Sequence, residues 1–332
     1  MMKPKIYILT TGGTIGHRSK QDGVAVMDFD PAKLISEINL PNIDYEFKHV
    51  IQKGSMDMVP DDWKAIAEAT NNAILEQAWG VVILHGTDTM HYTASALSFM
   101  LRDLGVPVVI TGSMIPGGDA GSDAVPNLRD AIRVAAYSDI AEVCIVFSAD
   151  LERVKGVIIR GNRARKVHSH FINAFDSINI PPIGYVEHRK IVLTNLKTNR
   201  RMHPKPRLNT NLDQKVVLIK LNPAMTPEVL ERHLQGASGA VLEGTGTGHI
   251  KTDLHSVVTR FAKPIVISTQ TIYGGEQLGS YDVDRSILSI SNIIPARDMT
   301  SETALVKLMW ALKQDGDIKL IMQTNVAGEI CG

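Results

Sequence analysis

The sequence has almost no cysteine: Cys144 and Cys331 are the only two among 332 residues. Two cysteines cannot build a disulfide framework or a cysteine-rich metal site, and such scarcity fits a reducing compartment. The chain also has no net formal charge, because 35 lysines and arginines balance 35 aspartates and glutamates. A neutral chain favours neither a nucleic-acid groove nor an acidic partner. We therefore expect a small-molecule ligand.

Long apolar runs are absent from the sequence as well. No uninterrupted apolar run reaches the roughly 18 residues that a membrane-spanning helix needs. Residues 1–5 lead directly into the first strand-like segment, without the apolar stretch and small-residue cleavage site of a secretory signal. We therefore expect a cytoplasmic protein that makes no membrane contact.

The common cofactor and nucleophile motifs are missing. Residues 11–16 have neither the glycine spacing of a dinucleotide fingerprint nor the Gly-Lys-Ser/Thr ending of a nucleotide loop. Residues 112–114 do not fit the Gly-x-Ser-x-Gly pattern of a serine hydrolase. His168 and His170 could offer two metal ligands, but no carboxylate or cysteine stands at ligand spacing. We expect no metal and no cofactor.

The sequence does contain a regular alternation of strand-like and helix-like segments. Apolar segments typical of buried strands cover residues 6–9, 80–85, 107–110 and 142–147, and helix patterns lie between them. Strand, helix and strand at this spacing predict a parallel sheet with helices on both faces. The expected fold class is therefore α/β.

A change in composition suggests two domains. Residues 188–213 are rich in Arg, Lys, Asn and Pro. They could form a basic nucleic-acid arm, but the lack of interleaved aromatic residues favours a solvated linker. We therefore place an N-terminal α/β catalytic domain at residues 1–187 and a smaller C-terminal α/β domain at residues 214–332.

A further strand-like segment covers about residues 45–51. Hydroxyl or carboxylate groups follow it and three of the other strands, at Thr14, Ser55 with Asp57, Thr87 with Asp88, and Ser113. Each of these loops alone could be a simple turn. Ligands of parallel sheets bind at the carboxyl ends of the strands, where these four loops would meet. Their convergence predicts a shared site.

The chemistry of this site would centre on threonine. A hydroxyl is a poor nucleophile until a base takes its proton, and a lysine can be that base when its pKa is lowered by burial and by nearby cations. Lys166 lies in the cationic run 163–167, just after a strand-like segment. Thr87 and Asp88 could orient it. A solvated basic turn explains the same run equally well.

Four motifs together resemble the L-asparaginases of bacterial and archaeal type. They are Thr11-Gly12-Gly13-Thr14-Ile15, His85-Gly86-Thr87-Asp88-Thr89-Met90, Thr111-Gly112-Ser113-Met114, and Ser122-Asp123-Ala124 with Asn127-Leu128. The resemblance continues through residues 294–300 and 307–310. By these motifs the chain resembles both the cytoplasmic, archaeal-like members and the asparaginase-like subunit of archaeal glutamyl-tRNA amidotransferase. That subunit carries an extra N-terminal domain. Because the first strand starts at residue 5, we expect the free asparaginase.

The resemblance implies a mechanism residue by residue. Thr14 matches the nucleophilic threonine, which attacks the side-chain amide carbon of the substrate and forms an acyl-enzyme that water hydrolyses. Thr87, Asp88 and Lys166 match a second triad, with Lys166 as the base toward Thr87. The order in which the two threonines act stays open, and no cofactor is implied.

The resemblance also implies substrate contacts and an assembly. Ser55 matches a contact to the substrate carboxylate, and Asp88 matches a contact to its α-ammonium group. Family members form dimers or pairs of dimers, so we expect a homodimer or a dimer of dimers. Thr247 and Glu276 are the possible contributors from a neighbouring subunit. The other expected pocket residues are Gly13, Met56, Gly86 and Ser113.

One feature departs from the family pattern. The family usually places a tyrosine in the loop after the first motif, where it orients the nucleophile, but residues 17–30 contain none. Lys20, Asp22 and Val24 occupy this region. Our hypothesis is that Lys20, or a residue from elsewhere, takes over this role.

The expected function is hydrolysis of L-asparagine to L-aspartate and ammonia. The alternatives are an amidase module that supplies ammonia to a partner subunit, and a sensor that binds small amino acids without hydrolysing them. The preference for asparagine over glutamine depends on about one methylene of pocket depth, worth about 1–3 kcal/mol, which the sequence does not reveal.

Overall fold

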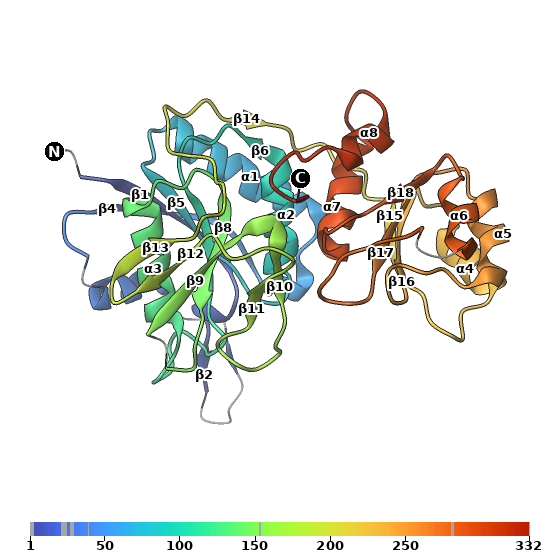
Figure 1. Ribbon diagram of the computed structural model, residues 1–332. Coiled ribbons are helices and arrows are strands. Elements are labelled where there is room, and N and C mark those ends of the chain that lie inside the picture. The colour runs from blue at the N-terminus through green and yellow to red at the C-terminus, as the bar shows by residue number, and fades with distance from the viewer. Residues whose placement is uncertain are drawn as a thin grey trace. The chain divides into compact units, whose positions relative to one another are not determined.

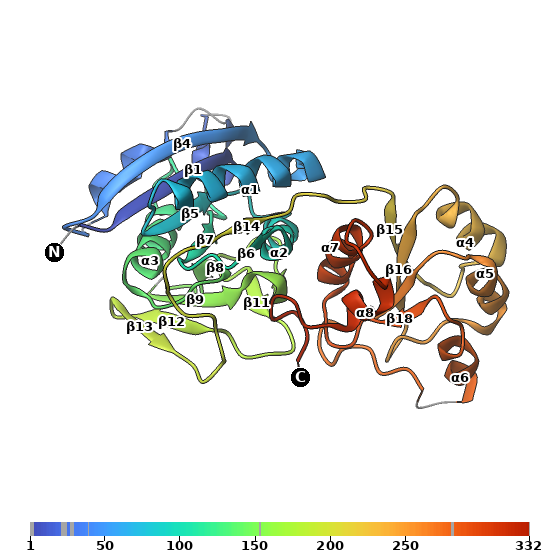
Figure 2. The same ribbon diagram turned by 90° about the horizontal axis from the view of Figure 1, so that it is seen from above.

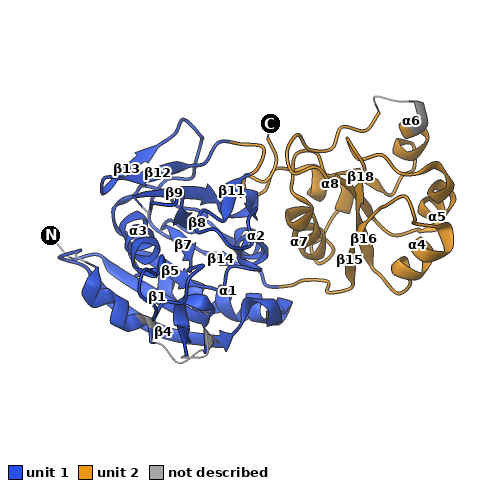
Figure 3. Ribbon diagram, turned by 90° about the horizontal axis from the view of Figure 1, so that it is seen from below, with its two compact units in different colours: residues 1–177, 181–210 blue, residues 178–180, 211–332 orange. Residues whose placement is uncertain are grey.

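The computed structural model of the chain describes residues 3–20, 25–26, 30–38, 40–152, 154–279 and 282–331. These residues form two compact units, each with its own main β-sheet (Figure 3). The first unit consists of residues 1–177 and 181–210, and the second of residues 178–180 and 211–332. The α/β class, with a larger first and a smaller second part, is confirmed.

The first unit is built on an eight-stranded sheet with the order β13-β12-β9-β8-β7-β5-β1-β4 (Figure 1). The strands β4, β1, β5, β7 and β8 are parallel, as expected. The central strands are buried along their whole length because helices cover both of their faces, and they are therefore almost entirely apolar. The bounds of the parallel strands are β1 Lys5–Gly12, β4 Asp44–Lys53, β5 Gly80–Leu84, β7 Val108–Thr111 and β8 Val143–Ser148.

Helices lie on the two faces of this sheet, with α3 on one face and α1 and α2 on the other (Figures 1 and 2). The α3 face buries alternate strand residues such as Ile8, Val82 and Val109 in one apolar core. The bounds are α1 Pro60–Leu75, α2 Met90–Met100 and α3 Ala124–Tyr137. Between β1 and β4 lies a 3-10 helix, η2 (Pro31–Glu37), which packs on α3.

Three strands at one side of the sheet depart from the expected parallel pattern. β9 (Lys155–Arg160), β12 (Gly184–Glu187) and β13 (Lys190–Leu193) all pair antiparallel. For β12 and β13 the physical reason is loop length, because a two-residue turn can join only antiparallel strands. His188 and Arg189 form such a turn between β12 and β13, with φ values of 47° and 67°.

The segment expected as a solvated linker, residues 188–213, is partly built into the first unit. It contains β13, and β14 (Arg207–Leu208) pairs with β6 (Leu101–Arg102). The Arg201 guanidinium also donates to the backbone carbonyls of Ala135, Ser138 and Trp79. Arg201 therefore satisfies carbonyl groups of the protein itself.

The second unit has a four-stranded parallel sheet with the order β15-β16-β17-β18. Separate apolar cores lie on its two faces, one with α4, α5 and α6, and one with α7 and α8 (Figure 2). The strands are β15 Val216–Lys220, β16 Gly239–Gly244, β17 Ile265–Thr269 and β18 Ile293–Pro295. The helices are α4 Pro227–Leu234, α5 His255–Arg260, α6 Asp282–Leu288, α7 Ser301–Ala311 and α8 Ile318–Gln323.

Across the described ranges, none of the helices combines the length and the apolar character that crossing a bilayer requires.

Candidate active site

The loops that follow β1, β4 and β5 pack against one another at the carboxyl edge of the large sheet. Gly13 has a φ of 81°, and a Cβ atom there would lie 2.3 Å from the backbone nitrogen of Gly86. A Cβ atom on Gly86 would in turn lie 2.6 Å from Ser55 Oγ. Because neither position has room for a side chain, glycine lets these three loops meet. The structure thus brings Gly13, Gly86 and Ser55 together.

Ser55 ties the β4 loop to the β5 loop. It opens a 3-10 turn, η3 (Ser55–Asp57), and is buried. Its hydroxyl accepts a hydrogen bond from the Asp88 backbone N–H at 3.1 Å, and its carbonyl accepts one from the Thr89 hydroxyl at 2.7 Å. Met56 lies on the same turn, but its side chain is 77% exposed.

The centre of the arrangement is a lysine that contacts a threonine and an aspartate. Lys166 ends β10 (Ala164–Lys166), which pairs with β11 (Phe175–Ser177). Its Nζ donates to Thr87 Oγ1 at 2.8 Å and to Asp88 Oδ1 at 2.7 Å. The Lys166 side chain is 13% exposed, whereas that of Asp88 is 61% exposed. An amine group, a hydroxyl and an accessible carboxylate therefore meet within hydrogen-bond distance, an arrangement that can activate a nucleophile.

Thr14 opens a 3-10 turn, η1 (Thr14–Gly16), directly after β1. Its carbonyl accepts hydrogen bonds from the backbone N–H groups of His17, at 3.0 Å, and Gly117, at 3.1 Å. A Cβ atom on Gly117 would lie 2.2 Å from the Ile15 carbonyl oxygen. The glycine-rich loop after β7 therefore packs directly on the Thr14 turn and fixes its backbone.

Ser113 follows β7 and is fully buried, and its Oγ has no hydrogen-bond partner within the described residues. Two buried side chains hold its loop. The Asp123 carboxylate accepts from the Met114 and Ile115 backbone N–H groups at 2.9–3.0 Å, and Asn127 donates to the Gly112 carbonyl at 3.0 Å. Burial raises the pKa of Asp123.

Asp123 and Asn127 belong to one of the four motifs, but the sequence suggested no role for either. Asp123 precedes α3, and Asn127 lies one turn into it, 2.9 Å from the Asp123 carboxylate. A signal was present, because an aspartate and an asparagine four residues apart at a helix start lie on one helix face. Their loop contacts come from the fold, however, and no local pattern predicts them.

Lys20 follows β2 (Arg18–Ser19), which pairs with β3 (Ala25–Val26), and its side chain is exposed. Ser19 anchors this segment, because its hydroxyl and backbone N–H both donate to the Asp119 carboxylate, at 2.6 and 2.9 Å. Asp22 and Val24 lie outside the described residues. The role suggested for Lys20 stays a prediction.

Thr247 and Glu276 belong to the second unit and lie next to each other. The Gln277 backbone N–H donates to the Thr247 carbonyl at 2.9 Å, and a Cβ atom on Gly248 would lie 3.0 Å from Glu276 Cγ. Burial raises the pKa of Glu276.

The Thr247 hydroxyl also takes part in a short chain of polar groups. It lies 3.1 Å from His249 Nε2, and His249 Nδ1 lies 2.9 Å from the buried Asp284 carboxylate. A carboxylate partner fixes the orientation of an imidazole ring. Asp284 thus holds the ring that faces the Thr247 hydroxyl, which the sequence spacing did not suggest.

The two histidines weighed as metal ligands serve local contacts. His168 Nδ1 accepts from the backbone N–H groups of His170, at 3.0 Å, and Phe171, at 2.8 Å, and its ring stacks on the Phe171 ring. These contacts organise a turn.

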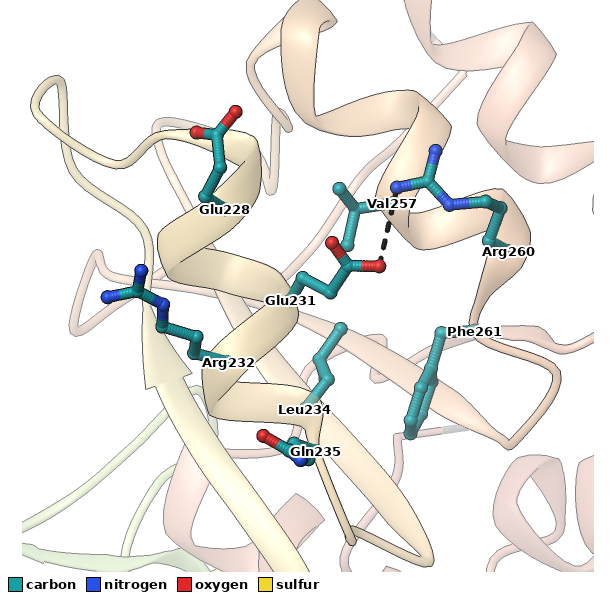
Figure 4. Close-up of a pocket in the computed structure, with 8 residues that line it drawn as sticks. All are labelled: Glu228, Glu231, Arg232, Leu234, Gln235, Val257, Arg260 and Phe261. Atoms are coloured by element: carbon teal, nitrogen blue, oxygen red, sulfur yellow. Dashed lines mark ion pairs between the residues drawn. The ribbon is translucent and has the colours of Figure 1, made fainter.

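A surface hollow in the second unit lies between α4 and α5 (Figure 4). Leu234, Val257 and Phe261 form its apolar part, and Glu231 and Arg260 face each other across it at 3.5 Å. None of the expected site residues lines it. We therefore take the sheet edge of the first unit, and not this hollow, as the candidate active site.

Comparison with known families covers nearly the whole chain. Residues 5–199 match the family described as "Asparaginase, N-terminal", and residues 215–324 match the "Glutaminase/Asparaginase C-terminal domain". The chain is 39% identical to the L-asparaginase of Thermococcus kodakarensis, with 99% of each chain covered. It is also 37% identical to a glutamyl-tRNA(Gln) amidotransferase subunit of Methanosphaera stadtmanae, over 99% of this chain and 77% of that protein.

Solved structures give the same result. The thermostable L-asparaginase from T. kodakarensis superposes with a TM-score of 0.90 at 39% identity, with 99% of both chains covered. L-asparaginase I from Vibrio cholerae has a TM-score of 0.86 at 34% identity, again with 99% of both chains covered. By sequence and by structure, this chain belongs to the asparaginase family.

Proposed function

We propose that the chain hydrolyses L-asparagine to L-aspartate and ammonia through an ester on a threonine. The observation that carries this proposal is the contact of Lys166 Nζ with Thr87 Oγ1 at 2.8 Å and with Asp88 at 2.7 Å, at the carboxyl edge of the sheet. Relatives named L-asparaginase, similar over 99% of the chain, support the same reaction.

In the proposed first step, Thr14 Oγ1 attacks the side-chain amide carbon of asparagine. The C–N bond breaks, the proton of the hydroxyl goes to the leaving nitrogen, and ammonia departs. In the second step, water attacks the ester carbon while Thr87 Oγ1 accepts a water proton and passes its own to the amine form of Lys166. The ester C–O bond to Thr14 then breaks, Thr14 Oγ1 takes a proton back from Lys166 through Thr87, and aspartate departs. The 2.8 Å contact between Lys166 Nζ and Thr87 Oγ1 supports this relay.

Substrate recognition follows from the two termini of the amino acid. We assign the α-carboxylate to the Ser55 hydroxyl and the α-ammonium group to the Asp88 carboxylate, whose 61% exposure leaves it accessible. The 3.1 Å contact between Ser55 Oγ and the Asp88 backbone supports this pairing. The remaining residues assigned to the pocket are Gly13, Met56, Gly86 and Ser113.

The assembly belongs to the same proposal. We infer a homodimer or a dimer of dimers in the cytoplasm, acting without nucleic-acid or membrane partners and without a cofactor. A relative described as a probable cytoplasmic L-asparaginase, from Campylobacter jejuni, has a TM-score of 0.81 at 26% identity and supports this location. Thr247 and Glu276 are the residues assigned to the site of a neighbouring subunit, and Lys20 to the orientation of Thr14.

A coupled ammonia assay tests the function. The purified chain is incubated with L-asparagine, L-glutamine and their D-forms, and aspartate is measured alongside ammonia. We expect one aspartate per ammonia from L-asparagine and loss of the reaction in Thr14→Ala. Ammonia release at the parent rate in this variant would refute the role of Thr14.

A second candidate function is the supply of ammonia to a partner subunit, favoured by the similarity to the amidotransferase subunit of M. stadtmanae. This reading predicts little ammonia release by the isolated chain and a large increase on mixing with the partner subunit. A non-catalytic amino-acid sensor is a third outcome of the same assay: it would bind aspartate but release no ammonia from any of the four substrates.

A further inference from the structure

The His85 side chain lies between the loop that follows β5, residues 86–89, and helix α2. It is fully buried and lies directly after β5 and directly before Gly86 and Thr87. Its Nδ1 lies 2.7 Å from the Gly86 carbonyl oxygen, and its Nε2 lies 2.9 Å from the Thr93 hydroxyl. Both ring nitrogens therefore have a partner within hydrogen-bond distance.

These two partners determine which nitrogen carries the proton. A carbonyl oxygen only accepts hydrogen bonds, so Nδ1 must carry the proton and donate it to Gly86. In a neutral ring Nε2 then accepts from the Thr93 hydroxyl. Burial lowers the pKa of His85 to about 4, so the ring is neutral at pH 7.

The hydrogen bond from His85 to the Gly86 carbonyl also sets the direction of the Thr87 backbone N–H. The Gly86 carbonyl and the Thr87 N–H belong to one planar trans peptide and point in opposite directions. With the carbonyl directed at the buried ring, the Thr87 N–H points away from it. Within the part of the chain that the structure describes, this N–H has no hydrogen-bond acceptor.

The neighbouring loops keep this peptide in place. Gly86 packs between Gly13 on one side and Ser55 on the other, with no room for a side chain. The His85 backbone is fixed too, because its N–H donates to the Thr111 carbonyl at 2.8 Å. A free N–H held rigidly beside the Thr87 hydroxyl has the properties of an oxyanion donor.

We propose that His85 is a positioning residue of the amidase reaction, which holds the Gly86–Thr87 peptide so that the Thr87 N–H donates to the oxyanion of the tetrahedral intermediate. The ring acts through this peptide and does not touch the substrate. This inference rests on the proposed function of the same site.

Two isosteric variants test the proposal by kinetics. In His85→Asn the amide nitrogen takes the place of Nδ1 and keeps a donor for Gly86, whereas in His85→Gln the amide nitrogen corresponds to Nε2 and the donor is lost. We expect His85→Gln to lower kcat for L-asparagine about 10²- to 10³-fold, the effect of losing one oxyanion donor. KM should stay near the parent value, because the lost contact is made in the transition state. His85→Asn should recover most of kcat.

The far side of the ring has its own variant and a matched control. Thr93→Val removes the hydroxyl that donates to Nε2, and we expect a smaller loss of kcat at unchanged KM. Thr70→Val removes a buried hydroxyl of α1 that, among the residues the structure describes, bonds only within its helix, to the Ile66 carbonyl at 2.8 Å. This variant should leave kcat unchanged. An equal fall in kcat in His85→Asn and His85→Gln would overturn the proposal. So would a rise in KM with kcat unchanged.

A measurement on the unsubstituted protein covers the case in which these variants fail to fold. Nitrogen-15 NMR of the imidazole should show a protonated Nδ1 and an unprotonated Nε2, and the reverse tautomer would overturn the proposal. If the parent chain releases no ammonia from asparagine, the proposed function has failed and this role falls with it. If the parent is active and the variants match it, only the role of His85 has failed.

Discussion

Two lysine–carboxylate pairs, one in each unit, differ in what surrounds the lysine. In the first unit Lys166 contacts the Asp88 carboxylate at 2.7 Å and a hydroxyl at 2.8 Å. In the second unit Lys307 Nζ lies 2.5 Å from the Glu329 carboxylate, and both side chains are 0% exposed. Lys307 also donates to the carbonyls of Met322 and Thr324, at 2.8 and 2.6 Å.

The two lysines differ in the groups that accept their hydrogen bonds and in the solvent exposure of their carboxylate partners. The three protons of the Lys307 ammonium face two carbonyls and a carboxylate, so this lysine has no group from which to take a proton. Burial lowers the pKa of Lys307, and the charge of Glu329 opposes that shift. Lys166 instead faces a hydroxyl, beside an aspartate that is 61% exposed. The same side chain thus joins α7 to the C-terminal segment in one unit and can take part in chemistry in the other.

The largest expected effect comes from removing the amine at the sheet edge. Lys166→Met keeps much of the side-chain volume but cannot accept a proton, so kcat for L-asparagine should fall about 10²- to 10⁴-fold, the range for loss of a general base. Steady-state ammonia release measures this loss. Circular dichroism should show an unchanged fold, and a variant that loses activity only because it unfolds would break the comparison.

The matching change in the second unit should have the opposite outcome. Lys307→Met leaves the Glu329 carboxylate buried without its partner, which should lower the free energy of unfolding by about 3–5 kcal/mol. Denaturant unfolding measures this change. Adding Glu329→Leu should restore only part of the stability, because Glu329 also accepts from the backbone N–H groups of Val326 and Ala327. An unchanged unfolding midpoint in Lys307→Met would contradict the structural role.

A buried histidine of the first unit, His91, should make the free energy of unfolding depend on pH. Burial, with a contribution from the positive charges of Arg165 and Lys166, lowers the pKa of His91 to about 3. An unfolded histidine titrates near pH 6.5, so between these values the unfolded chain binds more protons, and stability falls as the pH falls. The slope is at most about 1.4 kcal/mol per pH unit for each such group.

His91→Phe is the variant that isolates this effect. His91 Nδ1 has no hydrogen-bond partner within the described residues, so no hydrogen bond to this atom is lost there. Unfolding curves of parent and variant at pH 7, 5.5 and 4.5 should diverge, with the variant less sensitive to acid. Parallel pH dependence of the two proteins would contradict the neutral, buried state of His91.

The smallest effect is expected for the exposed pair in the hollow of the second unit. Arg260 and Glu231 lie 3.5 Å apart with side chains 60% and 64% exposed (Figure 4). Solvent screens such pairs, so Arg260→Ala should change the free energy of unfolding by about 1 kcal/mol or less. Ammonia release should match the parent. A clear loss of activity would show that this hollow has a part in the reaction.

Much of the fold follows from local patterns in the sequence. Apolar runs such as residues 80–84 predict buried parallel strands because only a strand covered on both faces tolerates them. The antiparallel strands β9, β12 and β13 do not follow from such patterns, since their direction depends on the loops that join them. The sequence predicts a solvated Arg201, because the carbonyl groups that it contacts lie more than 60 residues away along the chain.

The candidate site shows the same limit. The loops after the strands could be named because polar groups and glycines follow apolar runs. The contact of Lys166 with Thr87 joins residues 79 positions apart, so residue spacing left a basic turn equally open. The roles of His85, Asp123 and Asn127 depend on hydrogen bonds to loop carbonyls and N–H groups, which exist only once the strands are side by side.

The most direct test of the account is to locate the covalent intermediate. L-asparagine is mixed with the enzyme, the reaction is quenched in acid, and peptides are searched by mass spectrometry for an aspartyl ester. The proposed mechanism predicts the ester on the peptide that contains Thr14 and its absence in Thr14→Ala. The ester should accumulate in Lys166→Met, because Lys166 acts in the hydrolysis step. An ester on Thr87, with none on Thr14, would contradict it.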